Sequence, residues 1–256
     1  MKIVLLGSGN VATHLGLALQ KAGHEIIQVW SRDKAHAREL ASLLNAEGVT
    51  DIAQIILNAD LYILAVKDDA IASVASQLSL TDQLLVHTSG STGMNALEGV
   101  SERYGVIYPV QTFSKSKPLD FKIIPLAVEG NKPDVSKDLL HLAEGISQNA
   151  MKLDSEKRKV LHIAAVFACN FTNYLYTLSE QILLKEGLDF NLMRPMILET
   201  AEKAQQFSPA DAQTGPGVRN DAETMKKHLD YLKNDPELHE LYLKLSQGIV
   251  NFHYKP

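Results

Sequence analysis

The feature that most constrains this chain is a glycine-rich turn that follows directly on a short apolar run at the N-terminus. Residues Ile3 to Leu6 predict a strand, and Val11 to Lys21 predict a helix. Between them, the stretch from Gly7 to Ala12 reads Gly-Ser-Gly-Asn-Val-Ala, which is the G-x-G-x-x-A form of the dinucleotide fingerprint. The sequence therefore predicts an α/β sheet that binds a dinucleotide at the end of its first strand.

Each small residue of this turn has a physical role in the predicted site. Gly7 permits the tight turn, Gly9 lets the backbone approach a pyrophosphate, and Ala12 lets the helix pack closely on the strand. The phosphates are expected at the helix N-terminus, where amides are unpaired and the helix dipole is positive. A tight turn without a ligand is the alternative. The predicted cofactor contacts here are Gly7, Ser8, Gly9, Asn10 and Val11.

The end of the second predicted strand, Glu25 to Trp30, indicates which dinucleotide is bound. An NAD-binding protein usually has an acid there for the ribose hydroxyls, whereas this chain continues with Ser31 and Arg32. Arg32 can form a charge-assisted pair with a 2′-phosphate, and Asp33 is better explained as the cap of the next helix. A solvated surface cation is the alternative for Arg32. The sequence favours NADP over NAD.

Further strand ends should face the same cofactor, because ligands of open parallel sheets bind beyond the strand carboxyl ends. The first of these loops runs from Val66 to Asp69, and the second, His87 to Ser91, contains a histidine, three hydroxyl residues and a glycine. Capping of the next helix is the alternative for Asp68 and Asp69. The predicted cofactor contacts in these loops and the helix between them are Val66, Lys67, Ile71 and Thr88.

The chain divides into halves of different pattern. Short apolar runs alternate with amphipathic segments in residues 1–154, which predicts a Rossmann domain with a parallel sheet and helices on both faces. Residues 155–256 contain only helical patterns, beginning with one from Ser155 to Glu186 that lacks Gly and Pro and has Ser155 as its candidate cap. We therefore expect an α/β protein with a C-terminal all-helical domain for substrate binding and dimerisation.

Composition narrows the classes of protein that fit. The formal net charge of -5 argues against a nucleic-acid partner, and the N-terminal apolar run is too short for a signal peptide. Cys169, the single cysteine, is expected to be a small buried hydrophobe rather than a nucleophile, and it fits a reducing compartment. No cluster has metal-ligand spacing, and no run is long enough to span a bilayer. We expect a cytoplasmic protein without metal.

The helical half offers polar residues in unusual settings. His162 and Asn170 lie eight positions apart on the apolar helix, where they could serve as proton donor and substrate ligand or form structural hydrogen bonds. Arg219 precedes a helix that Asp221 could cap, so it suits an anionic group or an intersubunit contact. The stretch Val160 to Ala168 is apolar almost all round, so it should be buried in a helical bundle or at a subunit interface, and we predict a homodimer.

Together these pieces resemble a bacterial family of Rossmann-like proteins with a C-terminal helical domain of unknown function. That family is related to 6-phosphogluconate and β-hydroxyacid dehydrogenases, pyrroline-5-carboxylate reductase and deazaflavin-dependent NADP reductases. The resemblance covers nearly the whole chain and implies an NADP oxidoreductase without naming its substrate. It rests on GSGNVAT at 7–13, KDDAI at 67–71, HTSGS at 87–91, YPVQTF at 108–113, CNF at 169–171 and TGPGVRNDAETMKKH at 214–228.

The sequence departs from the resembled pattern at a few positions. Tyr108 stands where the family has His, and Asn220 stands where it has Gly. Val166 occupies the place, one turn before Asn170, where the related dehydrogenases usually have Lys. The usual catalytic acid of those dehydrogenases is therefore missing.

These observations predict an NADP-dependent oxidoreductase that transfers a hydride to or from a small polar substrate. The chemistry is expected at a cleft between the carboxyl edge of the sheet and the helical domain. A non-catalytic NADP-binding regulatory or scaffold protein is the alternative, favoured by Tyr108 and the absent Lys. The predicted catalytic and substrate-orienting residues are His87, Ser89, His162, Asn170 and Arg219.

Overall fold

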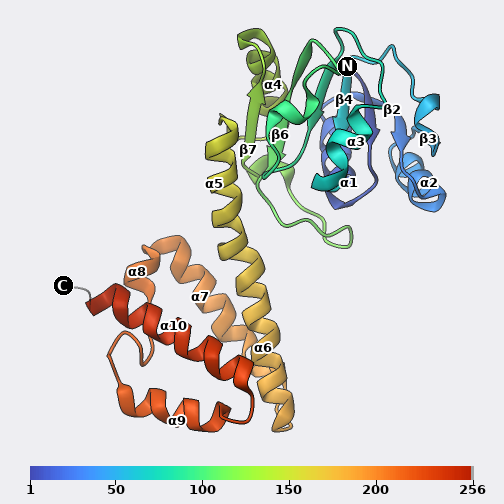
Figure 1. The fold of residues 1–256 in the computed structure, drawn as a ribbon. Coiled ribbons are helices and arrows are strands. Elements are labelled where there is room, and N and C mark those ends of the chain that lie inside the picture. The colour runs from blue at the N-terminus through green and yellow to red at the C-terminus, as the bar shows by residue number, and fades with distance from the viewer. Residues whose placement is uncertain (255–256) are drawn as a thin grey trace. The chain divides into compact units, whose positions relative to one another are not determined.

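The computed structural model describes residues 1–254, which fold into two compact units that meet between Leu175 and Tyr176 in the sequence. The first unit is built on an eight-stranded sheet of order β3-β2-β1-β4-β5-β6-β7-β8 (Figure 1). The reversal of strand order beside β1 places the end of that strand at a topological switch point, where α/β sheets bind ligands. The strands are β1 Lys2–Leu6, β2 Glu25–Trp30, β3 Glu47–Val49, β4 Leu61–Leu64, β5 Leu84–His87, β6 Arg103–Pro109, β7 Leu126–Gly130 and β8 Ala150–Lys152.

The sheet is parallel from β3 to β6, as predicted, but β7 pairs with β6 in the antiparallel sense. The physical reason lies in the connection. No α-helix intervenes between Pro109 and Leu126, so the chain lacks the helical crossover that usually returns a strand in the parallel direction. The predicted parallel sheet is therefore confirmed except at the β6–β7 pair, and the short strands β3 and β8 were not predicted.

Helices cover the two faces of the sheet unequally. On one face α1 (Asn10–Lys21), α2 (Lys34–Leu43) and α4 (Pro133–Ile146) pack against alternate residues of the strands. The other face is covered by α3 (Ile71–Ala75) and 3₁₀ segments. The central strand β4 is buried throughout, as expected for a parallel strand between two helical layers.

A single long helix leaves the sheet and links the two units. It consists of α5 (Ser155–Ala165), a π-helical stretch from Val166 to Phe171, and α6 (Thr172–Lys185). Its cap is Asp154, whose side chain accepts from the amide of Lys157, so the expectation of Ser155 as cap was wrong. Asp154 prevails because it lies one residue earlier, in extended conformation, as an N-cap requires.

The second unit is a group of helices, and no strand occurs among its described residues. Asp221 caps α9 as predicted, accepting from the amide of Thr224 at 3.0 Å. Gly187, with a φ of +69°, follows the end of α6. The helices and 3₁₀ turn of this unit beyond α6 are η6 Phe190–Leu192, α7 Arg194–Gln206, α8 Pro209–Ala212, α9 Ala222–Leu232 and α10 Pro236–Tyr254.

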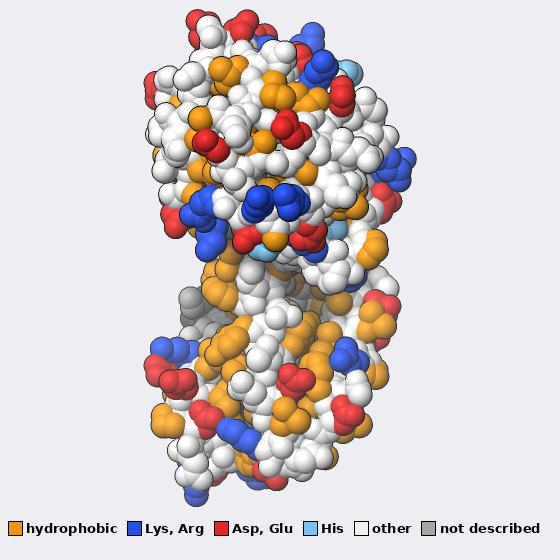
Figure 2. Space-filling view, turned by 90° about the vertical axis from the view of Figure 1, so that its right-hand side faces the viewer, with side chains coloured by type: hydrophobic (Ala, Val, Ile, Leu, Met, Phe, Trp, Pro, Cys, Tyr) orange, Lys and Arg blue, Asp and Glu red, His pale blue; other side chains and the backbone are white. Residues whose placement is uncertain are grey.

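Large apolar side chains lie open on the long helix and on the helices of the second unit (Figure 2). Val160, Ile163 and Phe167 are 67%, 50% and 65% exposed. Cys169 is exposed as well, which corrects the expectation that it is buried; the π-helical stretch that contains it has no buried residue. None of the described helices is long and apolar enough to cross a membrane.

Candidate functional site

The glycine-rich turn has the geometry that a dinucleotide needs. Gly7 adopts a φ of +124°, and a Cβ at this position would lie 2.2 Å from the carbonyl oxygen of Ala65, so only glycine fits. A Cβ on Gly9 would instead meet nothing within 4 Å. The backbone at Gly9 therefore borders open space, and a pyrophosphate can approach it closely.

The first turn of α1 leaves its amides available to such a ligand. Gly9 is the N-cap and supplies no side-chain cap, while its carbonyl accepts from the backbone and hydroxyl of Thr13, both at 3.0 Å. The side chain of Asn10 points its amide at the carbonyl of Phe113, at 2.8 Å, and is thus engaged by the chain itself. The unpaired backbone donors and the positive helix end fit the phosphates of a dinucleotide.

The end of β2 fits a phosphorylated ribose. The hydroxyl of Ser8 donates to Ser31 at 2.8 Å, which joins the glycine-rich turn to this strand end. Arg32 is exposed, and it forms no ion pair within residues 1–254. Asp33 accepts from the amide of His36 at 3.0 Å, and this hydrogen bond lowers the pKa of its carboxyl. Asp33 thus caps α2, as predicted.

The predicted cofactor contacts after β4 and β5 differ in their exposure to solvent. Val66 is half-buried and Lys67 is exposed, whereas Ile71 is fully buried in the core beside α3. The amide of Thr88 donates to the carbonyl of Leu64 at 3.1 Å, so this backbone holds the strand ends together.

Asp68 and Asp69 do not cap the helices that follow them, so the alternative interpretation of these residues is wrong. Neither the 3₁₀ turn Asp68–Ala70 nor α3 has a side-chain cap. The carboxylate of Asp68 accepts instead from the hydroxyl of Ser91, in the loop after β5. It links the two loops that follow β4 and β5.

His87 is fully buried at the end of β5. Its Nδ1 accepts from the amide of Ser89 at 3.2 Å, and its Nε2 lies 3.4 Å from the carbonyl of Gly93. Burial, with the nearby cation of Arg158, lowers the pKa of His87 to about 4. The ring is therefore neutral at pH 7, with both nitrogens engaged, and it shapes the loop.

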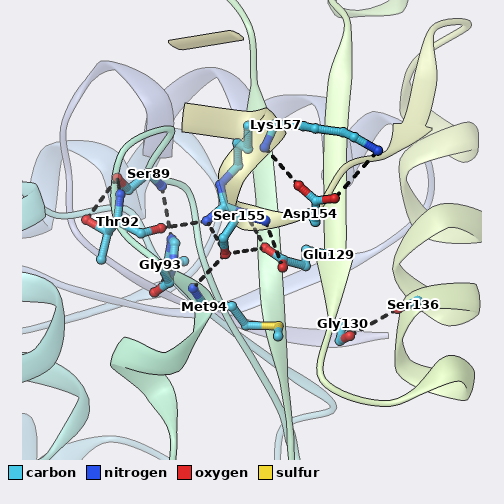
Figure 3. A network of polar contacts seen from close by, with 12 residues as sticks. Ser89, Thr92, Gly93, Met94, Glu129, Gly130, Ser136, Asp154, Ser155 and Lys157 are labelled. Carbon is cyan, nitrogen blue, oxygen red and sulfur yellow. Dashed lines mark hydrogen bonds and ion pairs between the residues drawn. The ribbon is translucent and has the colours of Figure 1, made fainter. Parts of the chain in front are cut away.

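Ser89 organises the same loop. Its hydroxyl oxygen accepts from the amides of Ser91 and Thr92, at 3.1 and 2.9 Å, and its hydroxyl donates to the Thr92 hydroxyl at 3.1 Å (Figure 3). The side chain is 6% exposed. These contacts leave it little freedom to orient a substrate.

A pair of side chains beside this loop is better suited to proton transfer than His87 or Ser89. The hydroxyl of Tyr108, at the end of β6, lies 3.1 Å from Nδ1 of the half-buried His162 on α5. A Cβ on Gly90 would lie 2.7 Å from the Tyr108 ring and 2.8 Å from that nitrogen, so glycine is required where the loop meets the pair. Burial, and then the charge of Asp68, raise the pKa of Tyr108, which keeps it protonated.

The remaining predicted residues are placed differently. Asn170 is exposed on the π-helical stretch in the first unit, and no hydrogen bond of its amide is recorded within residues 1–254. Arg219 is exposed in the second unit, two residues before the cap Asp221. No group of three or more His, Cys, Asp or Glu side chains in the described part of the chain is placed to hold a metal.

A buried ion pair beside the loop was not predicted from the sequence. Arg158 of α5 is 1% exposed and pairs with Glu129 of β7, whose side chain is 15% exposed. In the sequence, Arg158 belongs to the charged run Glu156 to Lys159, which reads as a solvated face. The pairing of Tyr108 with His162 was also missed, since it joins residues from distant parts of the chain.

Two protein families match parts of this chain. Residues 2–90 match the family described as NADP oxidoreductase, coenzyme F420-dependent. Residues 124–249 match a domain of unknown function, DUF2520. A search of curated proteins found no match for the sequence.

Among solved structures, the chain is similar to that of "putative NADP oxidoreductase BF3122 from Bacteroides fragilis" at 44% identity, with a TM-score of 0.93 and 98% of each chain covered. The chain belongs to this NADP oxidoreductase family. Membership confirms the cofactor and the general function predicted from the sequence, NADP and oxidoreduction.

More distant structures share the fold. Protein TM1727 from Thermotoga maritima is 24% identical, with a TM-score of 0.74 over 99% of this chain and 100% of that one. A 1-pyrroline-5-carboxylate reductase from Streptococcus pyogenes is 17% identical, with a TM-score of 0.64 over 98% of each chain. The Rossmann sheet followed by helices, as predicted, is thus an architecture that reductases also use.

Proposed function

We propose that this member of the family transfers a hydride between NADP(H) and a small polar substrate beside the loop that follows β5. The observation that carries the proposal is the Tyr108–His162 pair, which lies at 3.1 Å where Gly90 brings that loop against α5. Bound NADPH would supply the hydride. The chain would supply a proton donor within hydrogen-bond reach of the reacting carbonyl or imine.

Each group of residues in this site has a separate role in the proposed reaction. The turn from Gly7 to Val11 holds the pyrophosphate, and Ser31 with Arg32 receives the 2′-phosphate. His162 donates the proton, and Tyr108 fixes its ring through Nδ1. Asn170, exposed one turn beyond Val166, binds the substrate's polar group. His87 and Ser89 act by shaping the loop rather than by touching the substrate, because their polar atoms are already engaged. Arg219 remains a candidate for an anionic group.

A homodimer and a cytoplasmic location complete the proposal. The exposed apolar side chains of Val160, Ile163 and Phe167 support a subunit interface, since apolar surface of this kind is normally covered. The single cysteine supports a reducing compartment, and the net charge of -5 supports the absence of a nucleic-acid partner.

A non-catalytic NADP-binding protein is the second candidate. Val166 stands where related dehydrogenases usually have Lys, and both His87 and Ser89 are committed to the loop. Such a protein would bind NADPH and report its level without oxidising it.

One experiment separates these functions. NADPH oxidation is followed at 340 nm with a panel of imines, keto acids and aldehydes, and NADP reduction with hydroxy acids. An oxidoreductase turns over at least one member, and His162→Ala lowers that turnover by about 100-fold or more, the usual contribution of a general acid. Tight NADPH binding with no turnover across the panel would favour the non-catalytic protein.

A further inference from the structure

A buried cation joins the long helix to the sheet. Arg158 is among the largest fully buried side chains of the protein. One guanidinium nitrogen, Nη1, donates to Glu129 of β7, and Nη2 donates to the carbonyl of Thr92 at 2.6 Å and to the hydroxyl of Ser155 at 3.3 Å. Its Nε is buried without an acceptor among the described residues. A single side chain therefore connects α5, β7 and the loop after β5.

The carboxylate of Glu129 completes the connection. It accepts from the amide and the hydroxyl of Ser155, at 2.9 and 2.8 Å (Figure 3). The Ser155 oxygen accepts in turn from the amide of Met94 at 3.2 Å. Both ends of the loop segment from Thr92 to Met94 are thus tied to the first turn of α5.

Energetics indicate that this arrangement serves geometry more than stability. Desolvating two charges is unfavourable, and apolar residues of similar volume often replace a buried pair without loss of stability. The unpaired Nε adds to the cost. The charged pair instead fixes the relative orientation of the elements it joins, because the planar guanidinium of arginine binds several acceptors in one rigid geometry.

These bonds fix the part of α5 that carries the proposed proton donor, His162. His162 lies one turn after Arg158 on α5, and its Nδ1 reaches Tyr108 at 3.1 Å. A Cβ on Gly90, two residues before Thr92, would lie only 2.8 Å from that nitrogen. A small change in the approach of α5 to the loop would therefore separate the pair or make it clash with Gly90.

We propose that Arg158 and Glu129 are positioning residues that hold His162 against Tyr108. The proposal rests on the proposed function in giving His162 the proton donor's role. It goes beyond that function in assigning the buried ion pair to the alignment of the donor, although neither residue touches the substrate.

The test compares variants of the full chain by NMR with labelled histidine and tyrosine. Arg158→Met with Glu129→Gln removes both charges, keeps the volume and keeps an acceptor for Ser155. We expect a melting temperature within about 4 °C of the parent, as for a replaced buried pair. The nuclear Overhauser contact between the rings of Tyr108 and His162, whose centroids are 5.9 Å apart, should be lost.

A matched control and a conservative variant sharpen the result. Arg103→Met breaks the partly exposed Arg103–Asp138 pair, 2.6 Å long, and should keep the ring contact. Arg158→Lys keeps the charge but not the fork, so it should lose the contact too, and it serves if the double variant does not fold. A folded double or Lys variant that retains the contact at parental strength would overturn the proposal.

Titration with NADPH distinguishes failure of this inference from failure of the proposed function. The phosphate-binding turn contacts neither residue, so every folded variant should bind NADPH as the parent does. A parent that fails to bind NADPH refutes the proposed function but leaves the result on ring contact intact.

Discussion

At the scale of single residues, some side chains bond within a few positions of the chain, as the cap Asp33 does, whereas others, such as Arg158, bond to a distant strand. The tight turn at Gly7 and the cap Asp33 were predicted correctly because they depend on neighbouring positions. Arg158 could not be, since its ion pair reaches another strand, nor could Ser89, whose bonds to nearby residues depend on how its loop folds. Asn220 shows the limit of pattern matching. It adopts a φ of +49°, so Asn replaces the family's Gly in a left-handed conformation that both tolerate.

The conformation of Asn220 yields a prediction on stability. Asn220→Val should lower the free energy of unfolding by about 1–3 kcal/mol, because a β-branched residue is strained at positive φ. Asn220→Gly should leave it nearly unchanged. Chemical denaturation of both variants checks this, and equal stability of the Val variant and the parent would contradict it.

Arg32 carries the prediction on cofactor choice. Arg32→Glu should weaken NADPH binding by about ten- to a hundredfold, the worth of a hydrogen bond to a charged group, and should spare NADH. Fluorescence titration with both cofactors measures it, with Lys34→Glu as a control for general charge. A parent that binds NADH and NADPH equally would remove this role.

His87 predicts how stability depends on pH. Its pKa of about 4 in the folded protein lies below the ordinary 6.5, so an unfolded chain takes up this proton first as the pH falls. The stabilisation is complete above about pH 6.5 and is lost as the pH falls through 4, at most about 3 kcal/mol. Denaturation at about pH 7 and pH 5 should show a smaller difference for His87→Gln than for the parent. An identical difference would mean that His87 is not the group responsible.

At the scale of elements, the strands and helices with clear periodicity were predicted within a few residues. Strand β3 was missed because its sequence, Glu-Gly-Val, has too little apolar character to show. The antiparallel β7 depends on a loop without a helix, which periodicity does not reveal. That loop, residues 110–120, is tied to α1 by Asn10 and by His14, whose Nε2 lies 2.9 Å from the carbonyl of Ser114.

The attachment of this loop can be measured by proteolysis. Asn10→Ala should speed tryptic cleavage after Lys115 by about fivefold, since a net hydrogen bond contributes about 1 kcal/mol to keeping the loop closed. Asn131→Ala, which removes a side-chain bond to Glu102 elsewhere in the sheet, is the matched control and should not change this cleavage. Unaltered cleavage in the Asn10 variant would show that the loop is held by its apolar contacts alone.

At the scale of the whole molecule, the sequence predicted two parts, with a boundary near Asp154. The first compact unit extends instead to Leu175, because the start of the long helix is bound to the sheet through Arg158 and His162. The halves differ in how they use apolar residues. Those of the sheet are buried within the chain, whereas those of the long helix are largely exposed, which a sequence pattern alone cannot distinguish.

The exposed helix surface predicts the oligomeric state. Burying Phe167, 65% exposed in the single chain, in an interface would contribute roughly 1.5–3 kcal/mol per subunit. Phe167→Ser should therefore raise the dissociation constant of a homodimer by a factor of about ten or more, because both subunits carry the substitution. Ile123→Ser alters a side chain of similar exposure, 63%, on the sheet unit and should leave the dimer intact. Light scattering across a micromolar dilution series gives the masses; a monomeric parent at every concentration would show that this surface is covered by something other than a second copy.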